Sequence, residues 1–187
     1  MSLLSSLIYL FWFLSEILLH RILRGGKDTD KKKQDRGSLA YIWIIIIICT
    51  NISVYVTFNT SYPIYPGPLM NYTGLSLILL GMILRYWAIA SLGRLFTVVV
   101  TIREGHHIKK DGLYGIIRHP SYAGSLLSFL GFGLSLNNWL SLLITFVPVF
   151  IAFAYRMQVE EKMLLSQFGE EYSAYMKRTS RIIPWIF

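Results

Sequence analysis

The sequence predicts an all-α integral membrane protein with about five transmembrane helices. Apolar residues make up 54% of the 187-residue chain, which is more than a soluble domain of this size usually carries. They gather in runs close to the length of about 20 residues that crosses a bilayer as a helix. The Lys and Arg residues gather in alternate linkers between those runs. The length suits one domain, so we expect residues 1–187 to form a single membrane domain. Its N-terminal spans occupy 1–92, and 93–187 hold a loop, a helical hairpin and a C-terminal helix.

Five apolar segments are the expected spans, and polar residues interrupt two of them. Glu16 and His20 lie in the first and Arg85 lies in the third. The fourth and fifth are separated by Asn137 and Asn138 alone, which predicts a tight helical hairpin. The segments are 3–23, 39–58, 69–92, 122–136 and 139–155.

The basic residues predict the topology. The segments 21–36, 94–118 and 156–187 hold seven, five and five Lys/Arg residues, whereas 59–68 holds none. With five spans, all three basic segments fall on one side, which the positive-inside rule makes cytoplasmic. The N-terminus is then outside and the C-terminus cytoplasmic. The net charge of +8 is explained by topology and contact with anionic lipids, and no nucleic-acid partner is expected.

The stretch REGHHIKKDGLYGIIRHPSY, residues 103–122, carries most of the side chains capable of chemistry. His106 and His107 are adjacent and share no face, so we expect no metal site. Pro120 is suited to the first turn of the fourth helix, where its missing N–H costs nothing. The free N–H groups that follow would face an anion such as a cofactor carboxylate or phosphate. A simple helix cap at the membrane surface is the alternative.

A second polar stretch, beginning YRMQVEEKMLL, follows the fifth span. Arg156 and Glu160 are four residues apart and share a helix face. They form either an intrahelical ion pair, which contributes a few tenths of a kcal/mol, or a shared site level with the histidine loop. An amphipathic helix that covers this site is predicted from the spacing of six apolar and aromatic residues: Met163, Leu164, Phe168, Tyr172, Tyr175 and Met176.

The remaining polar and small residues in the spans have structural interpretations. Glu16 shares a helix face with His20, and we expect it to pack against another helix. Arg85 either pairs with a cofactor carboxylate or extends to the membrane interface, and we favour the interface. Gly131-Phe132-Gly133 follows no strand, so it predicts close helix packing rather than a nucleotide-binding turn.

Three stretches together resemble the isoprenylcysteine carboxyl methyltransferases and, more widely, the integral-membrane phospholipid methyltransferases. They are GHHIKKDGLYGIIRHPSYAG, RMQVEEKMLLSQFGEEYSAY and TSRIIP, and with the hairpin they cover about 92–184. The resemblance implies S-adenosylmethionine bound in an enclosed cytosolic pocket, with Arg156 contacting the substrate carboxylate. Glu161 completes the glutamate pair as a further candidate. The other positions implied as cofactor contacts are His106, His107, Ile108, Lys109, Tyr114, His119, Pro120, Ser121, Tyr122 and Glu160.

The expected activity is therefore S-adenosylmethionine-dependent methyl transfer to a lipid-like substrate, with the carboxylate of an isoprenylcysteine as the expected acceptor. The substrate would enter from the bilayer. A phospholipid amine methyltransferase is one alternative. A sterol-type reductase using NADPH is another, because reductases of that membrane fold carry a motif similar to RHPSY. The EE pair and FGEEYSAY argue against the reductase. The sequence defines no oligomeric state.

Overall fold

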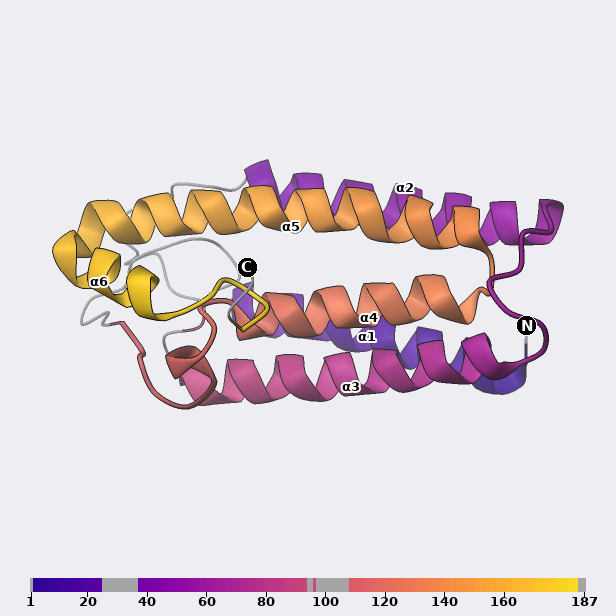
Figure 1. The fold of residues 1–187 in the computed structure, drawn as a ribbon, viewed down its shortest axis with the longest axis horizontal. Coiled ribbons are helices and arrows are strands. Elements are labelled where there is room, and N and C mark those ends of the chain that lie inside the picture. The colour runs from indigo at the N-terminus through magenta and orange to yellow at the C-terminus, as the bar shows by residue number, and fades with distance from the viewer. Residues whose placement is uncertain (1, 25–36, 94–95, 97–107, 185–187) are drawn as a thin grey trace.

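The computed structural model describes residues 2–24, 37–93, 96 and 108–184, and over these it is all-α. The longer helices run side by side along the long axis, and a short helix near the C-terminus lies at one end of the bundle (Figure 1). One isolated bridge, Ile117 with Ser180, is the extent of β pairing in the described part. The all-α prediction is confirmed. The helices are α1 (Leu3–Arg24), α2 (Gly37–Asn59), α3 (Leu69–Leu92), α4 (Pro120–Ser135), α5 (Trp139–Phe168) and α6 (Glu170–Arg178), with a short 3-10 helix, η2 (Gly112–Gly115).

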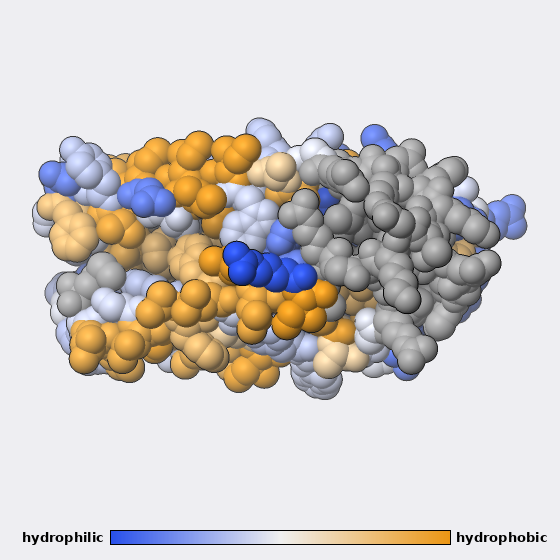
Figure 2. Space-filling model, turned by 180° about the vertical axis from the view of Figure 1, so that it is seen from behind, coloured by the Kyte–Doolittle hydropathy of each residue, from blue (hydrophilic) through white to orange (hydrophobic). Residues whose placement is uncertain are grey.

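Four of these helices, α1, α2, α3 and α5, are long and apolar enough to cross a membrane. Apolar residues cover most of the described surface on the side where α1 and α2 lie (Figure 2), as expected for contact with lipid. The chain is an integral multi-pass membrane protein. The predicted fourth span forms α4, whose 16 residues extend about 24 Å, less than the hydrocarbon core of about 30 Å.

Helix α5 is longer than predicted. Its 30 residues extend about 45 Å, so it passes the expected end at residue 155 and carries Arg156, Glu160 and Glu161 on the same rigid element. The polar residues beyond 155 are mostly good helix formers, so the loss of hydrophobicity there does not end the helix. It ends at Phe168, and the residue after it, Gly169, has a φ of 51° in the left-handed region that glycine adopts readily.

Glycines bring the backbones of α3 and α4 into contact. A Cβ atom on Gly74 would lie 2.3 Å from the carbonyl oxygen of Gly131, and one on Gly81 would lie 2.5 Å from that of Gly124. A Cβ on Gly133 would lie 2.8 Å from Leu142 of α5. The prediction that Gly131-Phe132-Gly133 serves close helix packing is confirmed. The α3–α4 pair is thereby a tightly packed unit in which no larger residue fits at these positions.

The tight hairpin between α4 and α5 is also confirmed. Asn137 takes a positive φ of 48°, and the side chain of Asn138 caps α5 by accepting from the N–H groups of Leu140 and Ser141. Since the hairpin makes α4 and α5 antiparallel, it returns the C-terminal part of α5 to the level of Pro120. The two polar stretches of the sequence therefore meet at one end of the bundle.

The predicted amphipathic helix is divided between the end of α5 and α6. Tyr172 and Tyr175 of α6 are both buried, while Glu170, Glu171 and Lys177 are exposed. The predicted apolar face is present. The turn at Gly169 brings its α6 part back toward the end of the bundle where the two polar stretches meet.

Candidate functional site

The segment before α4 is held in place by the C-terminal tail. The N–H groups of Arg118 and His119 donate to the carbonyls of Ser180 and Arg181 at 2.8 and 3.0 Å. Pro120 occupies the first turn of α4, as predicted, and His119 is its N-cap residue with a non-helical φ of −124° and ψ of 56°. The RHPSY motif therefore lies between a helix and the tail, and both restrict its conformation.

Glu161 holds this arrangement together through its side chain. Arg118 donates from Nε to its Oε1 at 2.8 Å and Arg181 donates from Nε to its Oε2 at 3.0 Å. Nε2 of His119 lies 3.3 Å from Oε1, and only 3% of Glu161 is exposed. Both carboxylate oxygens are thus occupied by protein groups. Arg118 also donates to the carbonyls of Met176 and Thr179. We name Glu161, Arg118, His119 and Arg181 the Glu161 clamp, because they join α5, the loop and the tail.

Two buried tyrosines fix the loop that precedes the motif. Tyr175 donates from its hydroxyl to the carbonyl of Tyr114 at 2.6 Å, and Tyr114 donates to the carbonyl of Ala88 at 3.3 Å. Burial raises the pKa of Tyr175 to about 12, against the opposing effect of Arg118, so its phenol is protonated and remains a donor at neutral pH. Both contacts attach the loop to neighbouring helices.

The first part of the predicted cofactor loop is only partly described. His106 and His107 lie outside the described residues. Ile108 is half-buried, and Lys109 forms an ion pair with Asp111 at 2.9 Å. The structure therefore locates Ile108 and Lys109 just before the segment fixed by Tyr114.

Arg156, Tyr122 and Glu160 form a hydrogen-bonded chain. Nε of Arg156 lies 3.4 Å from the hydroxyl of Tyr122, which donates to Oε2 of Glu160 at 2.8 Å. The ring of His119 stacks on that of Tyr122, with centroids 5.4 Å apart. Arg156 is only 2% exposed, so this is a buried arrangement connected through α4 and not the exposed intrahelical pair that spacing alone allowed.

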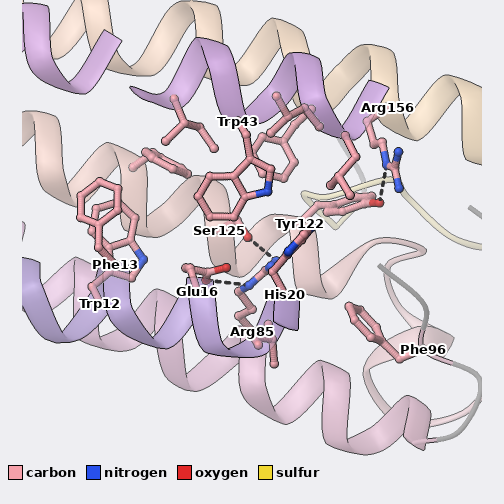
Figure 3. Close-up of a pocket in the computed structure, with 16 residues that line it drawn as sticks. Trp12, Phe13, Glu16, His20, Trp43, Arg85, Phe96, Tyr122, Ser125 and Arg156 are labelled. Atoms are coloured by element: carbon pink, nitrogen blue, oxygen red, sulfur yellow. Dashed lines mark hydrogen bonds and ion pairs between the residues drawn. The ribbon is translucent and has the colours of Figure 1, made fainter. Parts of the chain in front are cut away.

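An amphipathic pocket opens beside Arg156, between the first five helices (Figure 3). Its polar lining residues are at the level of Arg156 and slightly deeper: Glu16, His20, Arg85, Tyr122, Ser125 and Arg156. Its apolar walls come mainly from four helices and include Trp12, Phe13, Ile42, Ile46, Phe129 and Phe153. The sequence singled out none of these apolar residues, because an aromatic residue in an apolar helix looks the same whether it faces lipid or a cavity.

Arg85 corrects one prediction. Its Nε lies 2.8 Å from Oε1 of Glu16, and its Nη1 donates to the hydroxyls of Ser121 and Ser125. The interpretation that Arg85 extends to the membrane interface is wrong, because an ion pair with a carboxylate on α1 and hydrogen bonds to two hydroxyls on α4 hold it within the bundle. The expectation that Glu16 packs against another helix is confirmed. Ser121 is thereby an acceptor for Arg85.

The fold and the site together define a multi-pass helical membrane protein with an apolar pocket that ends at a buried arginine. The chain belongs to the phospholipid methyltransferase family, because the model of that family matches residues 69–171. This range begins at α3 and includes the RHPSY motif, the hairpin, Arg156, Glu160 and Glu161.

Similar proteins are isoprenylcysteine methyltransferases by name. The protein-S-isoprenylcysteine O-methyltransferase B of Arabidopsis thaliana is 40% identical over 115 residues, which are 60% of this chain and 58% of that protein. The protein-S-isoprenylcysteine O-methyltransferase of Schizosaccharomyces pombe is 32% identical over 171 residues, 90% of this chain and 64% of the relative. This chain thus spans less than two thirds of the length of these relatives.

The fold is also that of a solved structure. The eukaryotic intramembrane Ras methyltransferase ICMT (isoprenylcysteine carboxyl methyltransferase) superimposes with a TM-score of 0.64 at 24% sequence identity. The superposition covers 97% of this chain and 68% of that one. Nearly the whole bundle, including α1 and α2, therefore has a counterpart in that fold.

Proposed function

We propose that this protein transfers a methyl group from S-adenosylmethionine to the carboxylate of an isoprenylcysteine-type substrate. The observation that carries the proposal is the buried guanidinium of Arg156 at the polar end of a pocket with apolar walls. An apolar chain that ends in a carboxylate matches this pocket, because the chain would contact the apolar walls and the carboxylate would contact the guanidinium. A guanidinium can hold a carboxylate through two parallel hydrogen bonds, and the names of the relatives agree with this substrate class.

The residues at the mouth of the bundle fit a cationic, hydrogen-bonding cofactor. Glu160 is half-buried and uses Oε2 for Tyr122, and among the described residues no hydrogen bond to its Oε1 is found. That oxygen can accept from the ammonium or ribose of S-adenosylmethionine. Ile108, Lys109, Tyr114, His119, Pro120, Ser121 and Tyr122 are proposed to surround the cofactor together with His106 and His107. We assign Glu161 a positioning role instead, since its carboxylate is occupied by the Glu161 clamp.

The bound cofactor supplies an electrophilic methyl group on a sulfonium. A carboxylate acceptor is already ionised at neutral pH, so the protein is not required to remove a proton. Arg156 orients the acceptor, and Tyr122 holds Arg156 and Glu160 in fixed relation. The apolar walls exclude water. Positioning and exclusion of water are the contributions that such a displacement needs from its protein.

Methylation of a phospholipid amine is the second candidate, because the matching family carries that name. A guanidinium donates hydrogen bonds and accepts none, so it can contact a carboxylate directly but not an ammonium head group. The donor character of Arg156 therefore favours an anionic acceptor. The relatives named above are methyltransferases, which argues against the sterol-type reductase.

The decisive assay uses purified protein in liposomes, methyl-labelled S-adenosylmethionine, and either N-acetyl-S-farnesylcysteine or phosphatidylethanolamine. We expect label in the farnesylcysteine and its release as methanol on mild alkaline treatment, because a methyl ester is base-labile. Base-stable label in the phospholipid would instead establish an N-methyltransferase. Label in neither acceptor would contradict both proposals.

For the topology we propose five spans, with α4 as the short fourth span packed against α3. The N-terminus is then outside and the C-terminus cytoplasmic. Cys49 is the sole cysteine, so Cys49→Ser gives a background for single-cysteine labelling. Lys32→Cys and Lys177→Cys should react from the same, cytoplasmic side, and Ser61→Cys from the other. The five-span topology places four spans between these two positions. Labelling of Lys32→Cys and Lys177→Cys from opposite sides would require an odd number of spans between them and would contradict that topology.

We further propose that the lipid-like substrate enters from the bilayer between α1 and α2. A surface notch lined by Ile17, His20, Arg21 and Trp43 shares His20 and Trp43 with the inner pocket. The two rings meet edge to face with centroids 5.8 Å apart. A substrate with a photoreactive prenyl chain should crosslink to Ile17 or Trp43 if this is the route.

Cofactor binding should depend on Glu160. Glu160→Gln keeps the size of the side chain but removes its charge, so we expect binding of S-adenosylmethionine to weaken by about 1–3 kcal/mol. Calorimetry on purified protein is the measurement, and Glu170→Gln, an exposed site on α6, is the matched control. Wild-type affinity in a folded Glu160→Gln protein would place the cofactor elsewhere.

A further inference from the structure

The hydroxyl of Tyr122 joins two residues of α5 to which different ligands are assigned above. It accepts a hydrogen bond from Nε of Arg156 at 3.4 Å (Figure 3) and donates one to Oε2 of Glu160 at 2.8 Å. A guanidinium only donates hydrogen bonds and an ionised carboxylate only accepts them. The direction of both bonds is therefore fixed, and the single phenolic proton lies on the side of Glu160. We call these two hydrogen bonds the Tyr122 bridge.

The ring of Tyr122 is held between two other rings. His119 stacks on it with centroids 5.4 Å apart, and Phe153 of α5 meets it edge to face at the same centroid distance. His119 also belongs to the Glu161 clamp, so it is itself tied to α5 and the tail. These contacts restrict the ring, and its hydroxyl is a fixed point between α4 and α5.

The Tyr122 bridge connects a cation to an anion through a neutral hydroxyl. Arg156 is buried and Glu160 is half-buried, so solvent screens the bridge only in part. In a chain of hydrogen bonds each bond polarises the next, and the effect is larger where the local dielectric is low. The strength of the bond at one end of the bridge therefore depends on what the residue at the other end binds.

A ligand at either end weakens the bridge. A cation or hydrogen-bond donor on Glu160 withdraws negative charge from its carboxylate, so the carboxylate attracts the phenolic proton less and the hydroxyl oxygen accepts more weakly from Arg156. An anion on Arg156 reduces the polarisation of the hydroxyl by the guanidinium, so the hydroxyl donates more weakly to Glu160. The first ligand bears the cost of weakening the bridge and the second binds without it. By linkage, the two ligands raise each other's affinity by the same factor.

Resting on the proposed function, we propose that Tyr122 is a positioning residue that couples binding of the cofactor at Glu160 to binding of the acceptor carboxylate at Arg156. The coupling is positive, so the complex that holds both ligands is favoured over the complexes that hold one. The protein then binds S-adenosylmethionine most tightly when a carboxylate is present to receive the methyl group.

The test measures the affinity of the purified protein for S-adenosylhomocysteine by calorimetry, with and without saturating N-acetyl-S-farnesylcysteine. S-adenosylhomocysteine keeps the ammonium and ribose groups but lacks the sulfonium and its methyl group. Turnover and direct attraction between the sulfonium and the acceptor are therefore both absent. We expect the acceptor to raise the affinity of the wild type about fivefold, at the lower end of the range common for coupled sites. The methyl ester of the same acceptor has no carboxylate and should leave the affinity unchanged.

Tyr122→Phe removes the hydroxyl and keeps the ring, so it breaks the bridge while retaining the packing. The acceptor should then no longer raise the affinity for S-adenosylhomocysteine, and each ligand alone should bind at least as tightly as it binds the wild type. A merely structural role would weaken both ligands and leave their coupling unchanged. The matched control is Tyr9→Phe, which removes a buried hydroxyl that is hydrogen-bonded to Ser135 at 2.6 Å. Tyr9 does not line the pocket, so this variant should retain the fivefold coupling.

The comparison with the methyl ester uses the wild type alone, so it decides the question even if the Tyr122→Phe protein does not fold. The proposal is wrong if the acceptor leaves the affinity of the wild type for S-adenosylhomocysteine unchanged. It is also wrong if the increase persists with the methyl ester or in a folded Tyr122→Phe protein. Methylation of the farnesylcysteine by the wild type would in each of these cases leave the proposed function standing. If the wild type neither binds nor methylates the farnesylcysteine, the proposed function and the coupling are both wrong.

Discussion

Arg156→Lys is expected to lower kcat/KM for methyl transfer to a prenylcysteine at least about tenfold, while the affinity for S-adenosylmethionine stays near wild type. Tenfold corresponds to about 1.4 kcal/mol of transition-state stabilisation. Lysine keeps the charge but presents a single point donor, so it loses the planar fork that matches a carboxylate. The side chain is buried and lies against Tyr122, so solvent cannot replace the lost contacts.

The matched control for this variant is Arg178→Lys, an exposed position on α6 where the same exchange should leave both kcat and KM unchanged. Arg156→Ala should reduce turnover further, since it removes the charge as well. Near-normal turnover in both Arg156 variants would exclude the substrate role, and Arg156 would then serve only to order Tyr122 and Glu160.

The Glu161 clamp is the second place where a single substitution should have a large effect. Glu161→Ala leaves the guanidinium of Arg118 buried without its carboxylate, and loss of one partner from a buried ion pair costs about 3–5 kcal/mol. We expect a large fall in the thermal unfolding temperature in detergent, measured at a fixed scan rate because membrane proteins commonly unfold irreversibly. Glu161→Gln retains hydrogen bonding and should fall between wild type and Glu161→Ala.

The control for the clamp is Glu171→Gln. Glu171 pairs with Lys110 at 2.6 Å, but 56% of its side chain is exposed, and exposed pairs contribute about 0–1 kcal/mol. The unfolding temperature of the Glu171→Gln variant should match that of the wild type. A Glu161→Gln protein of unchanged stability that had lost cofactor affinity would contradict the positioning role and return Glu161 to the cofactor site.

The parts of the fold that the sequence predicted are those set by local physics. Hydrophobic runs located α1, α2 and α3, Pro120 located the start of α4, and the adjacent asparagines located the hairpin. The end of α5 was missed because hydrophobicity ends at residue 155, whereas helix propensity continues to Gly169.

The parts that were missed depend on pairs of residues far apart in the chain. Nothing near Arg85 in the sequence indicates that its partner is Glu16, and nothing near Glu161 indicates Arg181. The aromatic lining of the pocket was missed for a related reason, since Trp12 becomes distinct from its lipid-facing neighbours only when α4 is packed against it. The assignment of residues to cofactor or substrate stays a prediction.

The glycine contacts between α3 and α4 make these two helices the closely packed pair of the bundle, and α1 and α2 lie outside that contact. The family model matches from residue 69 onward, so it takes in the glycine-packed pair and the residues proposed for methyl transfer. Helices α1 and α2, which supply Trp12, Trp43 and Ile46 to the pocket, precede that range. Substitutions in these two helices can reshape the acceptor pocket without entering the α3–α4 contact. Under the proposed function, substitutions in α1 and α2 would change which lipid is accepted while the residues proposed for methyl transfer are retained.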